Sequence, residues 1–447
     1  MINKVLVANR GEIAVRIIRA CRELGLETVA IYSEADQYAC HVQLADEAVC
    51  IGPASAYESY LNPYNVLSAA QVTKADALHP GYGFLSENPK FVGMCQKSNI
   101  TFIGPDMDTM AKVGNKLQAR RIASEAGVPV IPGTLEALKN ALEAAKAAEK
   151  LGYPVMLKSV AGGGGKGIRR VERKSDMHKA FTDAQTEAFA TFGDGSLYME
   201  KVIENARHIE VQVLFDHYGT GVHLFERECS LQRRNQKVVE EAPCIFLNDA
   251  QRKRVCFLAM KAARAADYKN AGTVEFLVDE DHHFYFMEIN ARIQVEHPVT
   301  EMVTGVDIIK QQIHIAAGER LQLDQRNIRL NGHAIECRIN AEDITRNFMP
   351  SSGKVELMHI PGGKDIRFDT ALYMNCSIPA NYDPMVGKLI VCDNTRSEAL
   401  AKMRSALSEL VIQGVETNID FQIDLLTNKQ IISGELDTGL LDRIMEE

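Results

Sequence analysis

The sequence predicts a protein of mixed α/β and α+β class, with a parallel α/β domain at the N-terminus, a central domain and a strand-rich domain at the C-terminus. In the first part of the chain, strand-like runs alternate with helical runs, which is the rhythm of a parallel sheet with crossover helices. After Leu330, short strand-like runs prevail. The chain has 447 residues. Because a single core rarely keeps growing to that size, we expect two or three domains.

The N-terminal elements are marked by apolar runs and by helix-start signals. Two helices are predicted to begin at Pro63 and Pro89, because each proline follows an asparagine that suits the N-cap position. Another helix is predicted over residues 13–24, ended by Gly25. Strands are predicted over residues 5–8, 28–32, 48–51, 77–79 and 101–103.

The central region contains the glycine-rich loop GGGGKG at 162–167. The predicted strand that leads into it ends in Lys158, a charged residue that follows an apolar run and calls for an anionic partner. Backbone amides in such a loop can approach an anion closely. The loop is not a Walker A motif, because Gly167 stands where that motif needs Ser or Thr. A flexible turn is the alternative interpretation, but Lys158 favours phosphate binding.

The other predicted elements follow from the same periodicities. Helices are predicted over residues 106–127, 137–151, 248–266 and 397–410. Strands are predicted over residues 154–158, 197–203, 209–215, 332–339 and 354–359.

A hairpin is predicted where residues 272–278 and 283–290 flank a polar turn. If the turn takes residues 280–283, Asp279 pairs with Phe284 and Glu275 falls opposite Glu288. The stretch MEINARIQVE at 287–296 alternates apolar and polar residues, which on pattern alone favours a half-buried strand with a solvated face. We expect the backbone to leave the strand after residue 290.

The facing carboxylates of this hairpin change that interpretation. Like charges opposite each other destabilise a sheet unless a cation lies between them. Glu275, Glu288 and Asn290 all offer oxygen ligands, which suits Mg²⁺ or Mn²⁺ and the nucleotide phosphates that these ions bridge. The hairpin is therefore predicted to hold a metal ion.

The composition disfavours nucleic-acid binding and does not identify a binding partner. A net charge of −9 and a pI near 5.8 disfavour nucleic-acid binding. The ten cysteines include no Cys-x-x-Cys pair, and neither a signal peptide nor a membrane-spanning run is evident. We expect reduced thiols, a cytoplasmic location and no membrane association.

A glycine loop with Lys158 and a carboxylate–asparagine metal cluster resemble an ATP-grasp nucleotide site. Within that class, the sequence resembles biotin carboxylase over nearly its whole length. The resemblance rests on the following motifs: AxRGEIAxRIIRA at 8–20, HPGYGFLSEN at 79–88, GGGGKG at 162–167, KVVEEAP at 237–243, MEINARIQVEHP with its continuation to 305, and HAIECRINAED at 333–343.

The resemblance implies an architecture. An N-terminal biotin carboxylase domain would span residues 1–112, an ATP-grasp domain 113–330 with a mobile lid at about 130–203, and a C-terminal biotin carboxylase domain 331–447. The family members that match are the biotin carboxylase subunits of bacterial acetyl-CoA carboxylase, which act in fatty acid synthesis, and their sister subunits of pyruvate or other acyl-CoA carboxylases.

The resemblance also implies a set of cofactor-binding residues. ATP would be contacted by the glycine loop and by residues on several elements, with the segment 200–203 holding the adenine, while Mg²⁺ or Mn²⁺ would be held by Glu275, Glu288 and Asn290. The implied nucleotide and cofactor residues are Lys116, Lys158, Gly163, Gly164, Gly165, Glu200, Lys201, Val202, Ile203, His208, Gln232, Asn235, Glu275, Glu288 and Val295.

The catalytic residues come from the resemblance alone. Lys237, Arg292 and the backbone of Val295 would hold bicarbonate, and Glu296 would take its proton so that the exposed oxygen attacks the γ-phosphate. Carboxyphosphate would then release CO₂ and a phosphate that deprotonates biotin, while Arg338 would stabilise the biotin enolate. Taken without the family, Arg338 would be interpreted as a surface arginine. Lys116, beside Lys112 and Arg120, would be interpreted as merely solvated.

The chain departs from the family pattern at Asn235, where a histidine is usual. Asn can donate a hydrogen bond but cannot become cationic, which puts nucleotide affinity in question. Biotin is expected on a separate biotin carboxyl carrier protein, with carboxyltransferase subunits as further partners and a homodimer as the assembly. The alternatives are an inactive regulatory paralogue, which Asn235 favours, and an ATP-grasp ligase acting on another acid.

Overall fold

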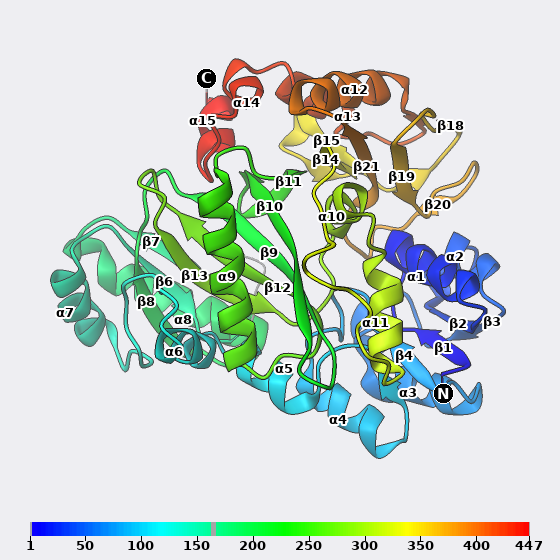
Figure 1. Cartoon of the computed structure of the whole chain (residues 1–447), viewed down its shortest axis with the longest axis horizontal. Coiled ribbons are helices and arrows are strands. Elements are labelled where there is room, and N and C mark those ends of the chain that lie inside the picture. The colour runs from blue at the N-terminus through cyan, green and yellow to red at the C-terminus, as the bar shows by residue number, and fades with distance from the viewer. Residues whose placement is uncertain (1, 162–166, 447) are drawn as a thin grey trace.

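The structure is a computed structural model that describes residues 2–161 and 167–446. An N-terminal region, a central region and a C-terminal region follow one another along the chain, and a smaller group of strands and helices extends from the central region (Figure 1). The mixed class predicted from the sequence is confirmed, with a parallel sheet at the N-terminus and antiparallel strands thereafter.

The N-terminal region is a five-stranded sheet with the order β3-β2-β1-β4-β5, and all its pairs are parallel. Its central strand β1 buries nearly all of its side chains, as the apolar run predicts. Helix α1 (Gly11–Glu23) buries an apolar stripe that includes Ile13 and Ile17. The strands are β1 (Lys4–Val7), β2 (Glu27–Tyr32), β3 (Glu47–Cys50), β4 (Ala77–His79) and β5 (Thr101–Phe102).

Both asparagine–proline pairs begin helices as predicted. Asn62 caps α3 (Pro63–Val72) and accepts hydrogen bonds from the backbone amides of Tyr64 and Asn65. Asn88 caps α4 (Pro89–Lys97) and accepts one from the amide of Phe91. Each cap satisfies amides that a helix start otherwise leaves unpaired.

Replacing Asn62 with Ala is expected to lower the free energy of unfolding by about 1 kcal/mol, because the two capped amides lose their acceptor. Urea unfolding followed by circular dichroism measures the change. The control is Asn62→Asp, which keeps an acceptor oxygen and should unfold near the wild-type midpoint. Equal losses in both variants would show that the cap bond is not the source of the effect.

One eight-stranded sheet runs through the central and C-terminal regions, with the order β13-β12-β9-β10-β11-β14-β21-β19. Strand β11 pairs with β14, so the sheet does not break at the boundary expected between residues 330 and 331. Its strands are β9 (Arg207–Phe215), β10 (Gly221–Arg233), β11 (Gln236–Ala242), β12 (Asn270–Val278), β13 (Phe284–Asn290), β14 (His333–Asn340), β19 (Ile366–Thr370) and β21 (Met385–Asp393).

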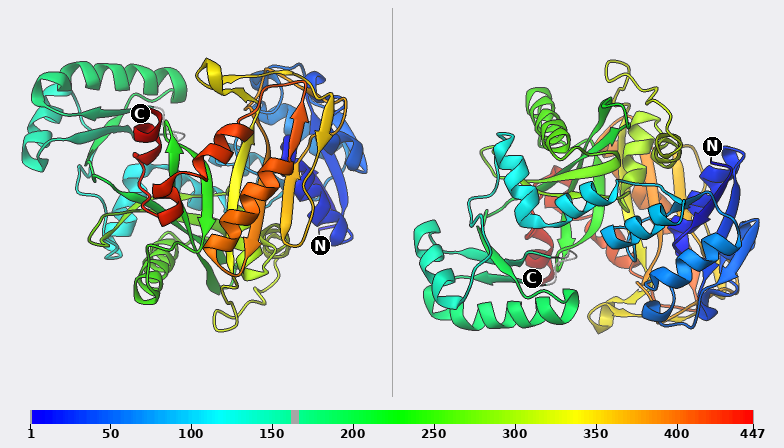
Figure 2. Two further views of the ribbon diagram at one scale, coloured as in Figure 1. Left: turned by 90° about the horizontal axis from the view of Figure 1, so that it is seen from above. Right: turned by 90° about the horizontal axis from the view of Figure 1, so that it is seen from below.

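Helices cover this sheet on both faces. The long helix α9 (Asp249–Ala265) packs on β9, β10 and β12, while α12 (Arg396–Glu409) packs on β14 and β21. The C-terminal strands lie between α12 on one face and helix α1 of the N-terminal region on the other (Figure 2). Helix α10 (His297–Thr304) packs on β10, β11, β14 and β21, and α11 (Ile308–Ala316) contacts α1 and β12.

A separate three-stranded antiparallel sheet, β7-β6-β8, carries α7 and α8 and lies within the segment for which a lid is expected. It has its own small core, centred on Leu157, Phe181 and Met199. Its elements are α7 (Ala141–Leu151), β6 (Val155–Ser159), β7 (Ile168–Val171), α8 (Met177–Phe192) and β8 (Leu197–Lys201). Helices α5 (Met107–Gly114) and α6 (Lys116–Glu125) replace the single helix predicted over 106–127 because Asn115 caps a new helix there.

The remaining elements are short. They are α2 (Cys40–Leu44), β15 (Glu342–Asp343), β16 (Met349–Pro350), β17 (Gly353–Lys354), β18 (Leu357–His359), β20 (Ser377–Ile378), β22 (Val411–Gln413), α13 (Ile419–Leu425), α14 (Lys429–Ser433), α15 (Leu440–Glu446), and the 3₁₀ turns η1 (Glu34–Asp36), η2 (Ala56–Glu58), η3 (Lys174–Asp176) and η4 (Ile344–Arg346). All ten cysteines are free thiols. Among the described residues, no helix has both the length and the apolar character needed to cross a bilayer.

Candidate active site

The predicted hairpin forms, and Glu275 lies opposite Glu288 as expected. The predicted pairing of Asp279 with Phe284 is wrong: Val278 pairs with Phe284, so the turn is one residue longer. A β-bulge between Glu275 and Phe276 adds one extra residue on the β13 side of the pair. This shift restores the register that places the two glutamates opposite each other. Strand β13 ends at Asn290, where we expected the backbone to leave the sheet.

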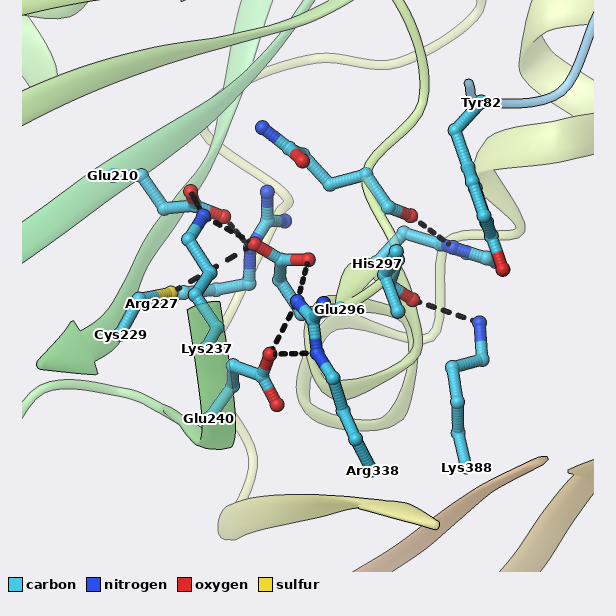
Figure 3. Close-up of polar contacts among 12 residues, drawn as sticks. Tyr82, Glu210, Arg227, Cys229, Lys237, Glu240, Glu296, His297, Arg338 and Lys388 are labelled. Carbon is cyan, nitrogen blue, oxygen red and sulfur yellow. Dashed lines mark hydrogen bonds and ion pairs between the residues drawn. The ribbon is translucent and has the colours of Figure 1, made fainter. Parts of the chain in front are cut away.

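Lys237 lies at the centre of a buried cluster of carboxylates. Its Nζ lies 2.5 Å from Oε1 of Glu296, 2.6 Å from Oε2 of Glu210 and 3.3 Å from Oε1 of Glu275 (Figure 3 shows the first two). Burial alone would lower the pKa of Lys237, but the three carboxylates outweigh it and raise that pKa well above its ordinary value. Lys237 is therefore a fixed cation.

Glu296 is fully buried and lies between two cations. Its Oε1 meets Lys237, and its Oε2 accepts a hydrogen bond from Nη2 of Arg338 at 3.0 Å (Figure 3). Burial would raise the pKa of Glu296, but Lys237, Arg338 and Arg227 outweigh it and hold the pKa well below its usual range. The carboxylate is therefore ionised at neutral pH and able to accept a proton.

Glu240 holds Arg338 from the other side. Its Oε1 accepts hydrogen bonds from Nε and Nη2 of Arg338, at 2.6 and 2.5 Å (Figure 3). Burial raises the pKa of Glu240 to about 7, against the lowering effect of Arg338. Arg338 itself keeps its charge, because Glu240, Glu296 and Glu336 outweigh burial and raise its pKa.

Residues expected to bind nucleotide form a second group. Nζ of Lys158 lies 2.5 Å from Oε2 of Glu200, whose Oε1 is 2.5 Å from Nη1 of Arg120. Nζ of Lys116 lies 3.3 Å from Oε2 of Glu288, so a lysine of α6 meets the hairpin glutamate. The interpretation of Lys116 as merely solvated is wrong, because its side chain is largely buried, and its neighbour Arg120 is fully buried.

His208, another residue expected to bind nucleotide, contacts the carboxylate cluster. Its Nε2 lies 3.1 Å from Oε2 of Glu275, and its Nδ1 is hydrogen-bonded to the side-chain amide of Gln232 at 2.8 Å. His208, Glu210 and Gln212 alternate along β9, so they point to one face of the sheet. Glu275 is the register partner of Glu210, which explains how both carboxylates reach Lys237.

Arg292 and Val295 follow the hairpin on a loop that leads into α10. Arg292 donates to Glu87 at 3.1 Å and to the side-chain oxygen of Gln294 at 2.7 Å. The carbonyl of Val295 accepts a hydrogen bond of 2.7 Å from Nζ of Lys388 (Figure 3). The segment from Asn290 to Glu296 is thus held by residues of both the N-terminal and C-terminal regions.

Not every expected residue joins these clusters. Nζ of Lys201 donates to the carbonyls of Gly152 and Tyr153, while Val202 and Ile203 are half-buried after β8. Asn235 is exposed in the two-residue turn between β10 and β11. Gly163, Gly164 and Gly165 lie outside the described residues.

The turn gives a structural reason for Asn235. Arg234 and Asn235 both adopt positive φ angles, of 51° and 62°. Two-residue hairpin turns of this kind favour Asn because its short side chain tolerates the left-handed region. The backbone of this turn therefore accommodates Asn235 without strain.

Sequence analysis missed several residues that complete the clusters, namely Glu87, Arg120, Glu210, Arg227, Glu240 and Lys388. Arg227 is fully buried, and its Nε lies 2.6 Å from Oε1 of Glu210. The alternation of polar residues in β9 was the one available signal for Glu210. Nothing local distinguished the others, because their partners are distant in the chain.

The hairpin fits a hard divalent cation. Glu275 and Glu288 face each other, and Asn290 adds an amide oxygen beside them, while its Nδ2 donates to Glu275 at 2.8 Å. Oxygen donors of this kind suit Mg²⁺. Ligand atoms of His208, Glu210 and Glu275 also converge, as do those of Glu210, Cys229 and Glu296. Lys237 already supplies a cation to both groups, through Glu210 and Glu275 in the first and through Glu210 and Glu296 in the second.

Comparison with family models divides the chain into matched segments. Residues 1–110 match the biotin carboxylase N-terminal domain, and residues 336–443 match the biotin carboxylase C-terminal domain. Residues 115–324 match the ATP-binding domain of the carbamoyl-phosphate synthase L chain.

Similar proteins cover the chain almost completely. Biotin carboxylase 1 of Bacillus subtilis (strain 168) is 52% identical over 443 residues, which are 99% of this chain and 98% of that protein. The crystal structure of a biotin carboxylase–β-γ-ATP complex from Campylobacter jejuni superposes with a TM-score of 0.97, at 49% identity and 99% coverage of both chains. The biotin carboxylase domain dimer of the Hydrogenobacter thermophilus 2-oxoglutarate carboxylase, in complex with MgADP, ADP and bicarbonate, also gives 0.97, at 48% identity, over 100% of this chain and 98% of that one.

Proposed function

The chain belongs to the biotin carboxylase family, and we propose that it carboxylates biotin on a separate carrier protein, using ATP and bicarbonate. It is an ATP-dependent carboxylase of the ATP-grasp ligase class. One observation of the site supports the proposed chemistry above all others: Glu296 is fully buried and contacts both Lys237 and Arg338. The two cations attract the bicarbonate anion to a carboxylate that can accept its proton.

In the first step, Lys237, Arg292 and the backbone of Val295 hold bicarbonate beside Glu296. Glu296 takes the bicarbonate proton, and the oxygen so exposed attacks the γ-phosphate of ATP. The bond between the β- and γ-phosphates breaks, which gives ADP and carboxyphosphate. Lys116, Lys158, Glu200 and His208 hold the nucleotide. Glu275, Glu288 and Asn290 would hold a Mg²⁺ ion, which would supply positive charge beside the phosphates.

In the second step, Arg338 acts on biotin. Carboxyphosphate breaks into CO₂ and phosphate, and the phosphate takes the proton from the ureido nitrogen. The nitrogen then attacks CO₂. Negative charge develops on the ureido oxygen, and a guanidinium held in place by Glu240 and Glu296 stabilises it without reorganisation.

We propose acetyl-CoA carboxylase as the parent enzyme, with a biotin carboxyl carrier protein and carboxyltransferase subunits as partners and a homodimer as the assembly. A similar protein belongs to a 2-oxoglutarate carboxylase, so the same fold serves other acceptors. A pyruvate or another acyl-CoA carboxylase is the alternative parent. Reconstitution with candidate carrier and carboxyltransferase subunits distinguishes these enzymes, because only the true partners carry the carboxyl group to a product.

The first test is phosphate release from MgATP and bicarbonate by the purified protein, with and without free biotin. Biotin is expected to stimulate release. Excess EDTA is expected to abolish it and added Mg²⁺ to restore it, because the phosphates lose their neutralising cation. Glu288→Gln, which removes one oxygen charge from the hairpin, is expected to raise the Mg²⁺ concentration needed for half-maximal rate by at least about tenfold.

Two outcomes would count against this function. Release that requires ATP and bicarbonate but responds neither to biotin nor to a biotinylated carrier protein would favour a ligase that acts on another acceptor. ATP binding detected by calorimetry, together with no release under any of these conditions, would favour an inactive paralogue.

A further inference from the structure

Lys388 of β21 is a fully buried lysine that none of the proposed chemical steps uses. Its Nζ donates to the carbonyl of Val295 at 2.7 Å and lies 3.1 Å from Oε1 of Glu12 on α1 (Figure 3 shows the Val295 contact). Burying an ammonium group is costly unless it is paired and hydrogen-bonded. Both contacts therefore fix this side chain in place.

The surroundings keep Lys388 charged. Besides Glu12, the ionisable groups that face it are Glu336 of β14, Arg367 and Asp369 of β19, and His297 of α10. Burial would lower the pKa of Lys388, but Glu12, Glu336 and Asp369 outweigh it and raise that pKa. The group that meets the Val295 carbonyl is thus an ammonium ion rather than a neutral amine.

The Val295 carbonyl and the Glu296 amide belong to one planar peptide unit. A charged donor on that carbonyl fixes the plane of the unit, and with it the start of the Glu296 side chain. Lys388 is also the register partner of Arg338 on the neighbouring strand. The strand pair β14 and β21 therefore supplies two cations. Lys388 contacts the backbone that precedes Glu296, and Arg338 contacts the Glu296 carboxylate.

We propose that Lys388 is a positioning residue for bicarbonate, acting through the peptide between Val295 and Glu296. Its ammonium group holds this peptide in place, and with it the Cα atoms of Val295 and Glu296, from which the Val295 N–H and the Glu296 carboxylate are directed towards the substrate. Glu12 holds the ammonium from the N-terminal region. This role rests on the proposed function, since it concerns the same bicarbonate site.

The test replaces Lys388 with Met, which keeps the length of the side chain and removes its charge. The KM for bicarbonate is expected to rise by at least about tenfold, because the peptide loses a charged hydrogen-bond donor, which contributes more than a neutral one. The KM for ATP is expected to change by less than about twofold, because the contacts of Lys388 in the described residues are with Val295 and Glu12 rather than with Lys116, Lys158 or His208. Lys388→Arg, which keeps a cation, is expected to recover part of the bicarbonate affinity.

Lys402 provides a matched control. It also donates to a carbonyl of β21, that of Cys392 at 2.7 Å, and pairs with an acidic residue, Asp393 at 2.8 Å, but it lies away from the Glu296 cluster. Lys402→Met is expected to leave both KM values unchanged. Glu12→Gln weakens the ion pair with Lys388 but leaves the hydrogen bond from Lys388 to Val295 possible. We expect it to raise the KM for bicarbonate less than Lys388→Met does.

The outcomes separate the inference from the proposed function. A Lys388→Met protein with unchanged KM for bicarbonate, or with equal rises in both KM values, overturns the positioning role. If that variant does not fold, an unchanged KM for bicarbonate in Glu12→Gln overturns it instead. Failure of the wild-type protein to release phosphate in response to biotin or the carrier overturns the proposed function itself.

Discussion

Replacing Glu296 with Gln is expected to lower bicarbonate-dependent ATP cleavage by about 10²–10⁴-fold, the usual contribution of a general base. The amide keeps the shape of the side chain and an oxygen that Lys237 or Arg338 can still contact, but it cannot accept a proton. Steady-state phosphate release measures the change, and calorimetry with ATP is expected to show unchanged affinity. Because the cations hold the pKa of Glu296 well below its usual range, its titration should not limit the wild-type rate between about pH 6 and 8.

Glu226 offers a control for Glu296. It is equally buried and pairs with Arg252 at 2.7 Å, but it lies outside the clusters around Lys237. Glu226→Gln is expected to lower stability and leave the rate per folded molecule close to wild type. A Glu296→Gln protein that cleaves ATP within about threefold of the wild-type rate is incompatible with a general base at this position.

Replacing Arg338 with Gln is expected to lower the rate of biotin carboxylation by about 10²–10³-fold, as removal of one oxyanion-stabilising donor does elsewhere. The guanidinium is held by Glu240 and Glu296, so its charge is in place before the biotin oxygen becomes negative. Carboxylated biotin, measured by retention of labelled bicarbonate, should fall much further than ATP affinity. Glu240 should then be protonated at neutral pH, since burial already raises its pKa to about 7 with Arg338 present.

The matched control for Arg338 is Arg396. It pairs with Glu241, the residue next to Glu240 on β11, through Nε at 2.6 Å, but it lies near α14, and Glu241 also meets His333. Arg396→Gln removes a comparable buried pair and is expected to leave the ratio of carboxylated biotin to ADP unchanged. Equal losses of carboxylation in the two variants would assign the effect of Arg338 to stability rather than to the enolate.

Some of the fold was predictable because its signals are local. The asparagine caps at Asn62 and Asn88 and the parallel N-terminal sheet follow from spacing within short segments, and the structure confirms them. The hairpin shows the limit of such reasoning. We predicted correctly that Glu275 lies opposite Glu288, but from a turn that was one residue too short. A β-bulge, which no residue type in the hairpin indicates, shifts the register by one residue and brings the two glutamates together.

The candidate site was less accessible from local pattern, because its contacts join distant segments. Lys116 looked merely solvated from its helical neighbours, yet its side chain is largely buried beside Glu288. Lys388 gave no signal at all, since its partners lie in the first helix and in the loop before α10. The family resemblance suggested the site residues that local chemistry could not, and their roles remain to be tested by the substitutions above.

The continuous ladder between β11 and β14 has a consequence for recombination between family members. The family models separate the C-terminal segment from the ATP-binding one, but the sheet crosses that gap. A chimera joined in that gap would take β14 from one parent and β11 from the other. Arg338 and Lys388 would then come from a different parent than the Val295–Glu296 loop that they contact. Within residues 2–161 and 167–446, the sheet β7-β6-β8 shares no ladder with the large sheet, and it has its own core. We therefore expect homologous proteins to tolerate an exchange of the small sheet better than an exchange of the C-terminal region. Exchange of the small sheet keeps the Val295–Glu296 loop together with Arg338 and Lys388, the two cations that hold it.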